Sequence, residues 1–336
     1  MIVRHQLFES IFQMTTSLMA IITNSILFWL IKFKSPPSLG GYKYLMMYIA
    51  LFEIVYACFD FVFLPYMYSE ASGFLVILDP IIITLPIDVL QVLDFIFNGF
   101  LGMAMAIFGI HFVYRYLVVS GNKTWTSTDP FRVTIWILTP FVVFFFYVTA
   151  CVMFLGKHKM SDGFMRYELE TELAYVGPFF DYRLSTEDNM HVYYGLGCVF
   201  VIGFCCFSVM IYFGFKCHFE VRALVKDSTK SYTYKSQQAQ LFYVLVAQSA
   251  IPFFLVFCPA CVLCISVYFN FSHPYFGKVL TLTNAIYPVF DPLPNMLMIK
   301  HYRNALFCWK PRFRERRNTI MPTLVITHKD NCSVVS

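Results

Sequence analysis

The stretch TLTNAIYPVFDPLPNMLMIKHYR, residues 281–303, is an apolar run interrupted by one acid and three prolines. It ends in a basic group, Lys300, His301 and Arg303. A carboxyl group is costly in hydrocarbon, so Asp291 should face other protein groups or water. Each proline leaves a backbone carbonyl without its helical donor, and neighbouring helices must satisfy that carbonyl. The stretch therefore predicts a kinked helix inside a bundle of membrane-spanning helices.

The composition of the whole chain agrees with a membrane bundle. Of its 336 residues, 58% are hydrophobic and only 13% are charged. Soluble domains average about 25% charged residues. Since no long linker divides the chain, we expect one receptor-sized membrane domain over residues 1–310 and a basic cytoplasmic tail over 311–336.

Seven apolar segments are each longer than the ~20 residues that a helix needs to cross a bilayer. They are residues 8–31, 42–67, 90–118, 132–156, 191–215, 239–266 and 276–299. A weaker run, 74–87, contains Asp79, Pro80 and Pro86, and we interpret it as an extracellular lid or a re-entrant segment. The sequence predicts an all-α membrane protein, a seven-helix bundle followed by a short amphipathic helix.

The distribution of Lys and Arg predicts the orientation. With these spans, 19 of the 25 basic residues fall on one side of the membrane and 6 on the other. Because basic loops stay in the cytoplasm, the N-terminus should be outside and the C-terminal tail inside. An odd number of spans is then required.

Five polar residues inside the predicted spans are candidates for internal sites. Asp94 and Asn98 lie one helical turn apart, and with Asn284 they are predicted to line a ligand pocket, although the first two could instead face a wet outer vestibule. Glu53 and Asp60 are seven residues apart and share one helical face, which must point into the bundle. These two acids could form a sodium or proton site, or serve as hydrogen-bonded packing between helices.

The inner end of the third span carries a candidate switch. Arg115 lies between Tyr114 and Tyr116, at the depth where a cytoplasmic partner would dock. An arginine at a span end can also simply extend to the interface. Arg222 and Lys226 lie in the basic stretch between the fifth and sixth spans and are expected to contact the same partner.

Prolines mark candidate hinges in the last two spans. Pro252 lies in the sixth span, and Pro288, Asp291 and Pro292 lie in the seventh. Proline kinks helices because it removes a backbone hydrogen bond. A protein that changes shape inside the membrane needs such points.

The sequence after the last span predicts an amphipathic helix. Two residues are candidates for modification because of their positions, one in this helix and one before the last span. Tyr302, Leu306 and Trp309 recur with helical spacing, which is typical of a helix lying along the membrane. Cys308 beside them is a candidate for palmitoylation. The sequon at Asn270 is the one that would face outside, and it is a candidate for glycosylation.

The positions of the cysteines, lysines and histidines argue against a bound metal or cofactor. Eleven cysteines show no zinc spacing, and none lies in the loop 157–190. The last span has lysines only at its edges, Lys278 and Lys300, which argues against a retinal Schiff base. His111 is the one histidine in a span core, which argues against a zinc hydrolase. We expect no catalytic residue, cofactor, metal or nucleic-acid partner.

Several motifs together resemble one known family. The sequence has GYKYLM at 41–46, FVYRYL at 112–117, QLFYVLVAQ at 240–248 and YPVFDPLP at 287–294. In this combination the chain resembles the Str group of nematode seven-transmembrane chemoreceptors, over nearly its whole length.

The resemblance implies a G-protein-coupled olfactory receptor of the sensory-cilium plasma membrane, with a small odorant as ligand and a heterotrimeric G protein as partner. Tyr114 stands where rhodopsin-like receptors carry an acid before the arginine, so an ionic latch built on that acid is missing. Two alternatives belong to other classes. A ligand-gated cation channel like the insect odorant receptors would have the opposite orientation, and a transporter should show repeat symmetry between its halves.

Overall fold

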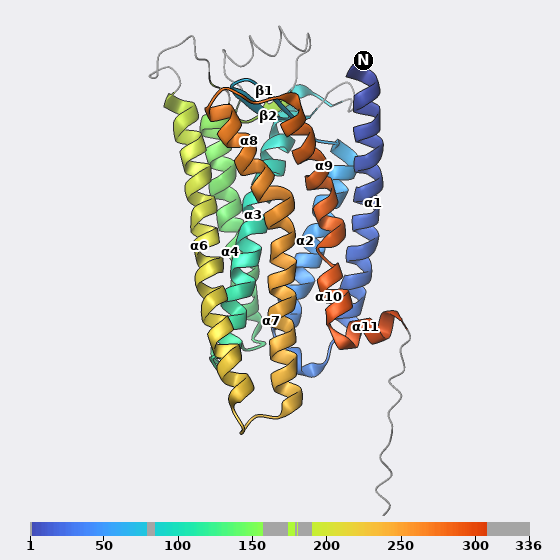
Figure 1. Cartoon of the computed structure of the whole chain (residues 1–336), viewed down its shortest axis with the longest axis vertical. Coiled ribbons are helices and arrows are strands. Elements are labelled where there is room, and N and C mark those ends of the chain that lie inside the picture. The colour runs from blue at the N-terminus through green and yellow to red at the C-terminus, as the bar shows by residue number, and fades with distance from the viewer. Residues whose placement is uncertain (1, 79–84, 157–173, 179, 181–189, 308–336) are drawn as a thin grey trace, which may run out of the picture.

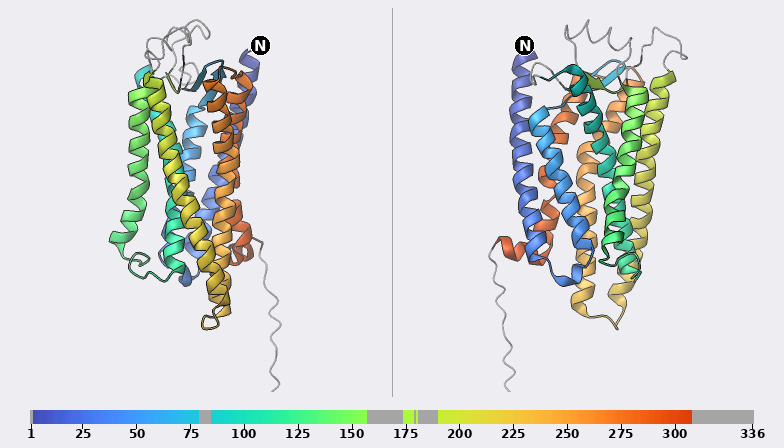
Figure 2. Two further views of the ribbon diagram at one scale, coloured as in Figure 1. Left: turned by 60° about the vertical axis from the view of Figure 1, so that its left-hand side comes forward. Right: turned by 180° about the vertical axis from the view of Figure 1, so that it is seen from behind.

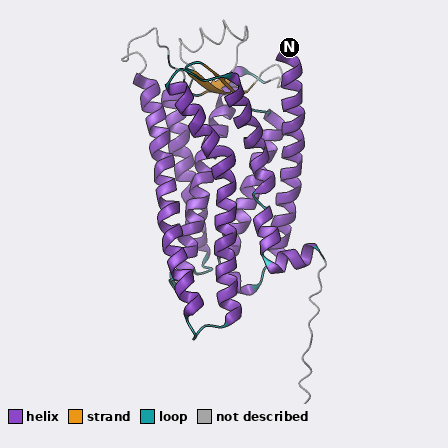
Figure 3. Ribbon diagram, in the orientation of Figure 1, coloured by secondary structure: helices purple, strands orange, loops and turns teal. Residues whose placement is uncertain are grey.

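In the computed structural model the chain is a bundle of long, roughly parallel helices with a small sheet at one end (Figure 1). The structure describes residues 2–78, 85–156, 174–178, 180 and 190–307. The N-terminus lies at the end that carries the sheet, which we call the sheet end. The helix α11 lies across the opposite end, which we call the α11 end (Figures 1 and 3).

Seven spans account for the long helices, as the sequence predicts. They consist of α1 Ile2–Lys34, α2 Tyr42–Phe63, α3 Ile87–Val119, α4 Pro130–Ala150 continued by η2 Cys151–Leu155, α6 Met190–Lys226, α7 Tyr232–Pro252 continued by η3 Phe253–Phe257 and α8 Cys258–Tyr268, and α9 Pro274–Phe290 followed by α10 Leu293–Met298. Six of these are long and apolar enough to cross a membrane as single helical segments. The seventh falls short because the Asp291-Pro292 step divides it.

The second span is shorter than the predicted 42–67. Helix α2 ends at Phe63, and Leu64 takes a left-handed conformation with φ 45°. Pro65 follows, and a residue before proline is disfavoured in the α conformation. The chain then enters β1 Tyr66–Glu70, which the hydropathy pattern could not separate from the helix.

A three-stranded sheet is the feature that an all-α prediction omits. β1 pairs antiparallel with β2 Gly73–Leu78, and β2 pairs antiparallel with β3 Ala174–Val176. Residues 74–78 of the ambiguous 74–87 run therefore form a strand, which favours the lid over the re-entrant segment. Residues 79–84 and most of the loop 157–190 lie outside the described part.

The sheet is fastened to α9 and α3. The Ser69 hydroxyl accepts a hydrogen bond from the Gly277 N–H at 3.0 Å and donates to the His273 carbonyl at 2.8 Å. A Cβ at Gly277 would collide with the Met67 carbonyl oxygen, so only glycine permits this approach. Gln91 of α3 donates to the Tyr175 carbonyl at 2.8 Å. The sheet is thus a fixed cover across one end of the bundle.

The break between α9 and α10 is stabilised by a neighbouring helix. Pro292 has no N–H, so the Pro288 carbonyl lacks its usual donor four residues later. Asn24 of α1 supplies one, since its amide donates to the Pro288 carbonyl at 2.9 Å and to the Ala20 carbonyl at 3.1 Å. This contact replaces the backbone hydrogen bond that Pro292 removes from the seventh span.

The long span α7–α8 changes its winding where the sequence predicts a hinge. Pro252 ends α7, the next five residues Phe253–Phe257 form a π-helical turn, and α8 continues from Cys258. Single π-turns inside helices often occur at functional positions because they displace the backbone hydrogen bonds.

The short helix after the last span is present as α11 Lys300–Leu306. Its Tyr302 is buried, and the Tyr302 and Ser35 hydroxyls lie 2.7 Å apart, which holds α11 against the end of α1. Trp309, the palmitoylation candidate Cys308 and the predicted tail 311–336 lie outside the described residues.

Candidate functional site: an apolar cavity and a buried polar core

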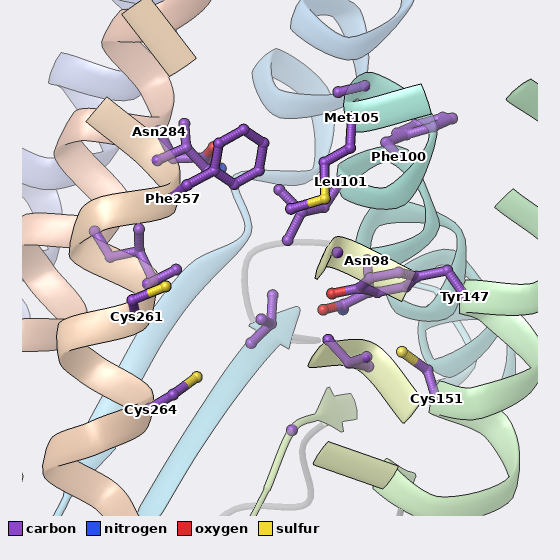
Figure 4. A pocket seen from close by; sticks show the side chains of 18 of the residues that line it. Asn98, Phe100, Leu101, Met105, Tyr147, Cys151, Phe257, Cys261, Cys264 and Asn284 are labelled. Carbon is purple, nitrogen blue, oxygen red and sulfur yellow. The ribbon is translucent and has the colours of Figure 1, made fainter. Parts of the chain in front are cut away.

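A cavity of about 340 Å³ lies among the helices just inside the sheet. Figure 4 shows it from close by, with walls from α3, α4, α8 and α9. Its volume is at the small end of ligand pockets, which range over roughly 300–1,000 Å³. The sheet contributes Phe74, Val76 and Val176 to the lining, so the cover described above closes one side of this space.

The lining is apolar with a few polar groups. Phenylalanine, leucine, valine, methionine and cysteine side chains predominate, and no Asp, Glu, Lys, Arg or His belongs to the lining in the described part of the chain. The polar side chains are Tyr56, Asn98, Tyr147, Asn284 and Tyr287. Such a lining suits a small neutral molecule, because an ion would have no counter-charge.

Two of the three predicted pocket residues line the cavity. Asn98 and Asn284 lie on opposite walls, on α3 and α9. Asp94 does not line it, because it lies behind Asn98 and is fully buried. Asn98 donates to the Asp94 carbonyl at 2.9 Å and to its Oδ1 at 3.2 Å, while Oδ2 has no hydrogen-bond partner among the described residues.

Tyr147 and the cysteines of the lining were not among the predicted pocket residues. Tyr147, Cys151, Cys261 and Cys264 border the cavity from α4, η2 and α8. In the sequence these residues belong to uniformly apolar spans, and nothing distinguishes them from residues facing lipid. Only the packing of α4 on α3, where a Cβ at Gly102 would collide with Tyr147, places that ring inside.

Below the cavity, a buried polar core connects α2, α7, α9 and α10. Gln248 donates to Asp291 Oδ2 at 2.5 Å and accepts from Asn295 at 2.9 Å. Glu53 interacts electrostatically with Asp291 and with Tyr287, yet neither of its carboxylate oxygens has a partner in hydrogen-bonding geometry among the described residues. The predicted hinge at Asp291 is therefore also a contact point between three helices.

The cavity and the polar core meet at Tyr56 and Tyr287. Asn284 donates to the Tyr56 hydroxyl at 2.5 Å, and the Tyr56 and Tyr287 rings have centroids 5.5 Å apart. Both tyrosines also interact with Glu53. Groups that line the cavity thus contact groups that hold the α9–α10 break.

Asp60 lies on the same face of α2 as Glu53 but has separate partners. It accepts hydrogen bonds from Gln13 at 2.8 Å and from Ser17 at 2.6 Å, both on α1. This geometry matches the interpretation of Asp60 as hydrogen-bonded packing, whereas Glu53 lies beside Tyr287 and Asp291.

Arg115 is buried inside the bundle, toward the α11 end, and does not extend to the membrane interface. One guanidinium nitrogen donates to the Gln238 carbonyl at 3.0 Å and to the Gln238 side chain at 2.8 Å. The guanidinium also lies over the Tyr42 ring at 5.0 Å. These contacts join α3 to α7, and among the described residues Arg115 has no acidic partner.

The two tyrosines beside Arg115 have different neighbours. Tyr114 is buried, stacks on Tyr42 and donates to the Thr126 carbonyl at 3.2 Å. Tyr116 faces α6, where the Lys216 ammonium lies 5.6 Å from its ring centre. Together they fix the end of α3 between α2 and α6.

The remaining candidate positions lie at the two ends of the molecule. Arg222 and Lys226 are exposed on the last turns of α6, at the end where α6 and α7 extend beyond the other helices (Figure 2). In the turn that follows, hydrogen bonds from Thr229 hold the pKa of Asp227 below its usual value, so this turn carries one acid among its bases. Asn270 is exposed near the sheet end, with φ 56°.

No group of three or more His, Cys, Asp or Glu side chains suited to a metal ion occurs within the described ranges. The chemistry of the cavity and of the polar core is one of hydrogen bonding and packing.

Comparison with known proteins identifies the family. The family model for serpentine type 7TM GPCR chemoreceptor Str matches residues 9–307. The chain is 29% identical to the G-protein coupled receptor str-217 of Caenorhabditis elegans, over 90% of this chain and 92% of that protein. It is 25% identical to the serpentine receptor class r-10 of the same nematode, over 84% and 85% of the two chains.

Solved structures agree with this assignment at the level of the fold. The crystal structure of squid rhodopsin superposes with a TM-score of 0.64 at 12% identity, covering 91% of this chain and 86% of that one. A family match over most of the chain, on a rhodopsin-like bundle, leads to one conclusion: the chain belongs to the Str family of serpentine seven-transmembrane chemoreceptors, which are G-protein-coupled receptors and not a class of enzymes.

Proposed function

We propose that this receptor detects a small, neutral odorant and activates a heterotrimeric G protein in the plasma membrane of a sensory cilium. The observation that carries the proposal is the contact between the apolar cavity and the polar core at Tyr56 and Tyr287. A molecule in the cavity would touch the same side chains that hold the α9–α10 break. Ligand size and polarity follow from the lining, which is apolar and without charged residues.

The orientation follows from the basic residues. In our proposal the sheet end faces outside and the α11 end faces the cytoplasm, because the loops and tail at the α11 end carry most of the Lys and Arg. The cavity then lies in the exterior half of the bundle, and Arg115, Arg222 and Lys226 lie where a cytoplasmic protein would dock.

Activation in this proposal is a change of population between two arrangements of α7 and α9–α10. A ligand shifts such an equilibrium only by the difference between its affinities for the two states. The π-turn after Pro252 borders the cavity through Val256 and Phe257, and the break at Asp291-Pro292 lies one turn below Tyr287. Both are places where the backbone can bend at low cost.

The contact between Arg115 and Gln238 would hold the resting arrangement. It ties α3 to α7 in the part of the bundle nearest the cytoplasm. Moving α7 outward would break both hydrogen bonds, release the guanidinium and open a cleft for the G protein. A neutral partner makes this latch weaker than an ion pair with an acid, since charge-assisted hydrogen bonds between two ionised groups are stronger.

The Arg115→Ala variant tests the assigned role. We expect ligand-dependent G-protein signalling to fall to background while surface expression, measured by antibody staining of intact cells, persists. Signalling of normal size from Arg115→Ala would refute the role of Arg115 in coupling and leave the receptor without an identified switch.

A further inference from the structure

One wall of the cavity, formed by α3 and α4, carries two polar side chains, Asn98 and Tyr147. Both amide hydrogens of Asn98 that could bond in this position point to Asp94, at 2.9 Å to its carbonyl and 3.2 Å to its carboxyl group. The Asn98 carbonyl oxygen is therefore turned away from Asp94. In Figure 4, Asn98 lies on the cavity wall beside Tyr147. Asn98 thus offers the cavity an acceptor and not a donor.

Tyr147 offers a donor beside that acceptor. Its side chain is only 5% exposed, and its hydroxyl makes no hydrogen bond to any described residue. The ring lies flat on α3 because Gly102 has no side chain there. Figure 4 shows the Tyr147 ring and Asn98 together, with their oxygen atoms directed into the cavity from the same wall.

The opposite wall is different because its polar groups satisfy each other. Asn284 donates to the Tyr56 hydroxyl at 2.5 Å. Between the two walls the lining is phenylalanine, aliphatic, methionine and cysteine side chains. Within the described part of the chain, the cavity therefore has an apolar body and one polar end, where the Asn98 oxygen and the Tyr147 hydroxyl have no hydrogen-bond partner.

We propose that the α3–α4 wall is the specificity-determining subsite, and that it selects a small apolar molecule with one hydroxyl group. This inference rests on the proposed function and names the ligand class of the same cavity. A hydroxyl group accepts from the Tyr147 hydroxyl and donates to the Asn98 carbonyl oxygen, so both protein groups gain a partner.

Other chemical classes fit this pair less well. A ketone or an ether accepts from Tyr147 but leaves the Asn98 oxygen facing another acceptor. An alkane leaves both groups without a partner, and a site built for a hydrogen bond rejects ligands that lack it. An ammonium ion would enter a lining without any carboxylate. Among the classes compared, the alcohol satisfies donor and acceptor together.

The experiment uses four six-carbon probes of equal size and the full-length receptor in lipid nanodiscs. The probes are hexan-1-ol, hexan-2-one, dipropyl ether and hexane. Thermal unfolding is followed at increasing probe concentrations, because a ligand that binds only the folded state raises the unfolding temperature according to its Kd. Direct effects of the probes on the bilayer are subtracted with the Gly203→Phe variant, whose new ring fills the cavity from α6.

We expect hexan-1-ol to bind about tenfold more tightly than the ketone or the ether, the ratio that one satisfied hydrogen bond provides. Asn98→Leu, which removes the acceptor that distinguishes the alcohol, should abolish this preference. Tyr147→Phe, which removes only the hydroxyl, should weaken the binding of hexan-1-ol, hexan-2-one and dipropyl ether alike by about tenfold, because all three accept from that hydroxyl, and should leave the affinity for hexane unchanged. Tyr243→Phe makes the same change on an exposed tyrosine outside the cavity and should leave the preference intact.

The other possible outcomes contradict either the hydroxyl subsite alone or ligand binding in the cavity as a whole. If the ketone, the ether or hexane binds as tightly as the alcohol and Gly203→Phe abolishes that binding, the hydroxyl subsite is wrong while the cavity remains a ligand site. If Asn98→Leu keeps the full preference, or if Tyr147→Phe binds the three oxygen-containing probes as tightly as the wild type, the subsite is also wrong. If no probe stabilises the wild-type receptor more than Gly203→Phe, both the subsite and the proposed binding of small molecules in this cavity are refuted.

Discussion

At the scale of single residues, Asn24 shows how the bundle accommodates the prolines of its last span. Pro292 has no N–H to donate to the Pro288 carbonyl, and the Asn24 amide supplies the hydrogen bond in its place. Asn24 is completely buried, and its own carbonyl oxygen has no partner among the described residues. The amide therefore contributes through one interhelical contact, between α1 and the break in the seventh span.

Replacing Asn24 by alanine should destabilise the receptor by about 1 kcal/mol, the order found for interhelical hydrogen bonds in membranes. Thermal unfolding of the purified protein measures the effect as a lower melting temperature. Thr23→Ala is the matched control, because the neighbouring Thr23 is partly exposed and bonds only within its own helix. Equal losses in the two variants would contradict the role given to Asn24.

Single residues also show the limits of the sequence. Asp291 and Arg115 could be identified because charge inside an apolar segment is rare. Asn98 and Asn284 were found for the same reason, as polar residues in apolar spans. Tyr147 was not found, because the local sequence of an apolar helix is the same whether its tyrosine faces lipid or the interior of the bundle. Which way it points depends on Gly102, on another helix.

At the scale of elements, α7 makes side-chain hydrogen bonds to two other spans, to α3 on one side and to the α9–α10 span on the other. Gln238 contacts Arg115 of α3, Gln240 donates to the Met298 carbonyl of α10, and Gln248 joins Asp291 to Asn295. Three glutamines on one helix thus connect the third span to the seventh. Amide side chains suit a switch, because a hydrogen bond to a neutral amide is weaker than an ion pair and breaks more readily.

Gln238→Leu should raise ligand-independent signalling about fivefold, because losing one hydrogen bond of about 1 kcal/mol shifts the resting equilibrium by that factor. Gln238→Glu should have the opposite effect, since a carboxylate accepts from Arg115 more strongly. Basal G-protein activity, normalised to surface expression, measures both. Equal basal activity in the two variants would contradict the latch.

The sequence predicted the helical spans but not the sheet. Hydropathy located seven spans because each needs a long apolar run, and prolines indicated the kinks. The sheet could not be found, because β1 continues the apolar run of α2 and β3 is a three-residue strand in a long loop. Its register depends on contacts with α9 and α3, and these form only in three dimensions.

At the scale of the whole molecule, the placement of the two ends relative to the membrane decides between classes of protein. The counts of basic residues, 19 against 6 with the predicted spans, predict that the α11 end lies in the cytoplasm. A receptor that couples to a G protein requires this orientation, whereas a channel of the insect odorant-receptor type has the reverse.

An epitope tag at the C-terminus tests the orientation. In intact cells the tag should be inaccessible to antibody and should stain only after the membrane is made permeable. A tag at the N-terminus is the control and should stain in both conditions. Staining of the C-terminal tag on intact cells would reverse the topology and exclude coupling as proposed.

The central claim is that a small molecule in the cavity controls the G protein at the other end, and one comparison tests it most directly. Gly203 and Gly197 lie on the same helix, but only Gly203 lines the cavity, and a Cβ at Gly197 meets no atom within 4 Å. The measurement is the calcium response of cells expressing wild-type, Gly203→Phe or Gly197→Phe receptor to a panel of volatile compounds, at matched surface expression. We predict that a compound that activates the wild type also activates Gly197→Phe and fails on Gly203→Phe. An unchanged response from Gly203→Phe would show that the ligand acts elsewhere and would contradict the account.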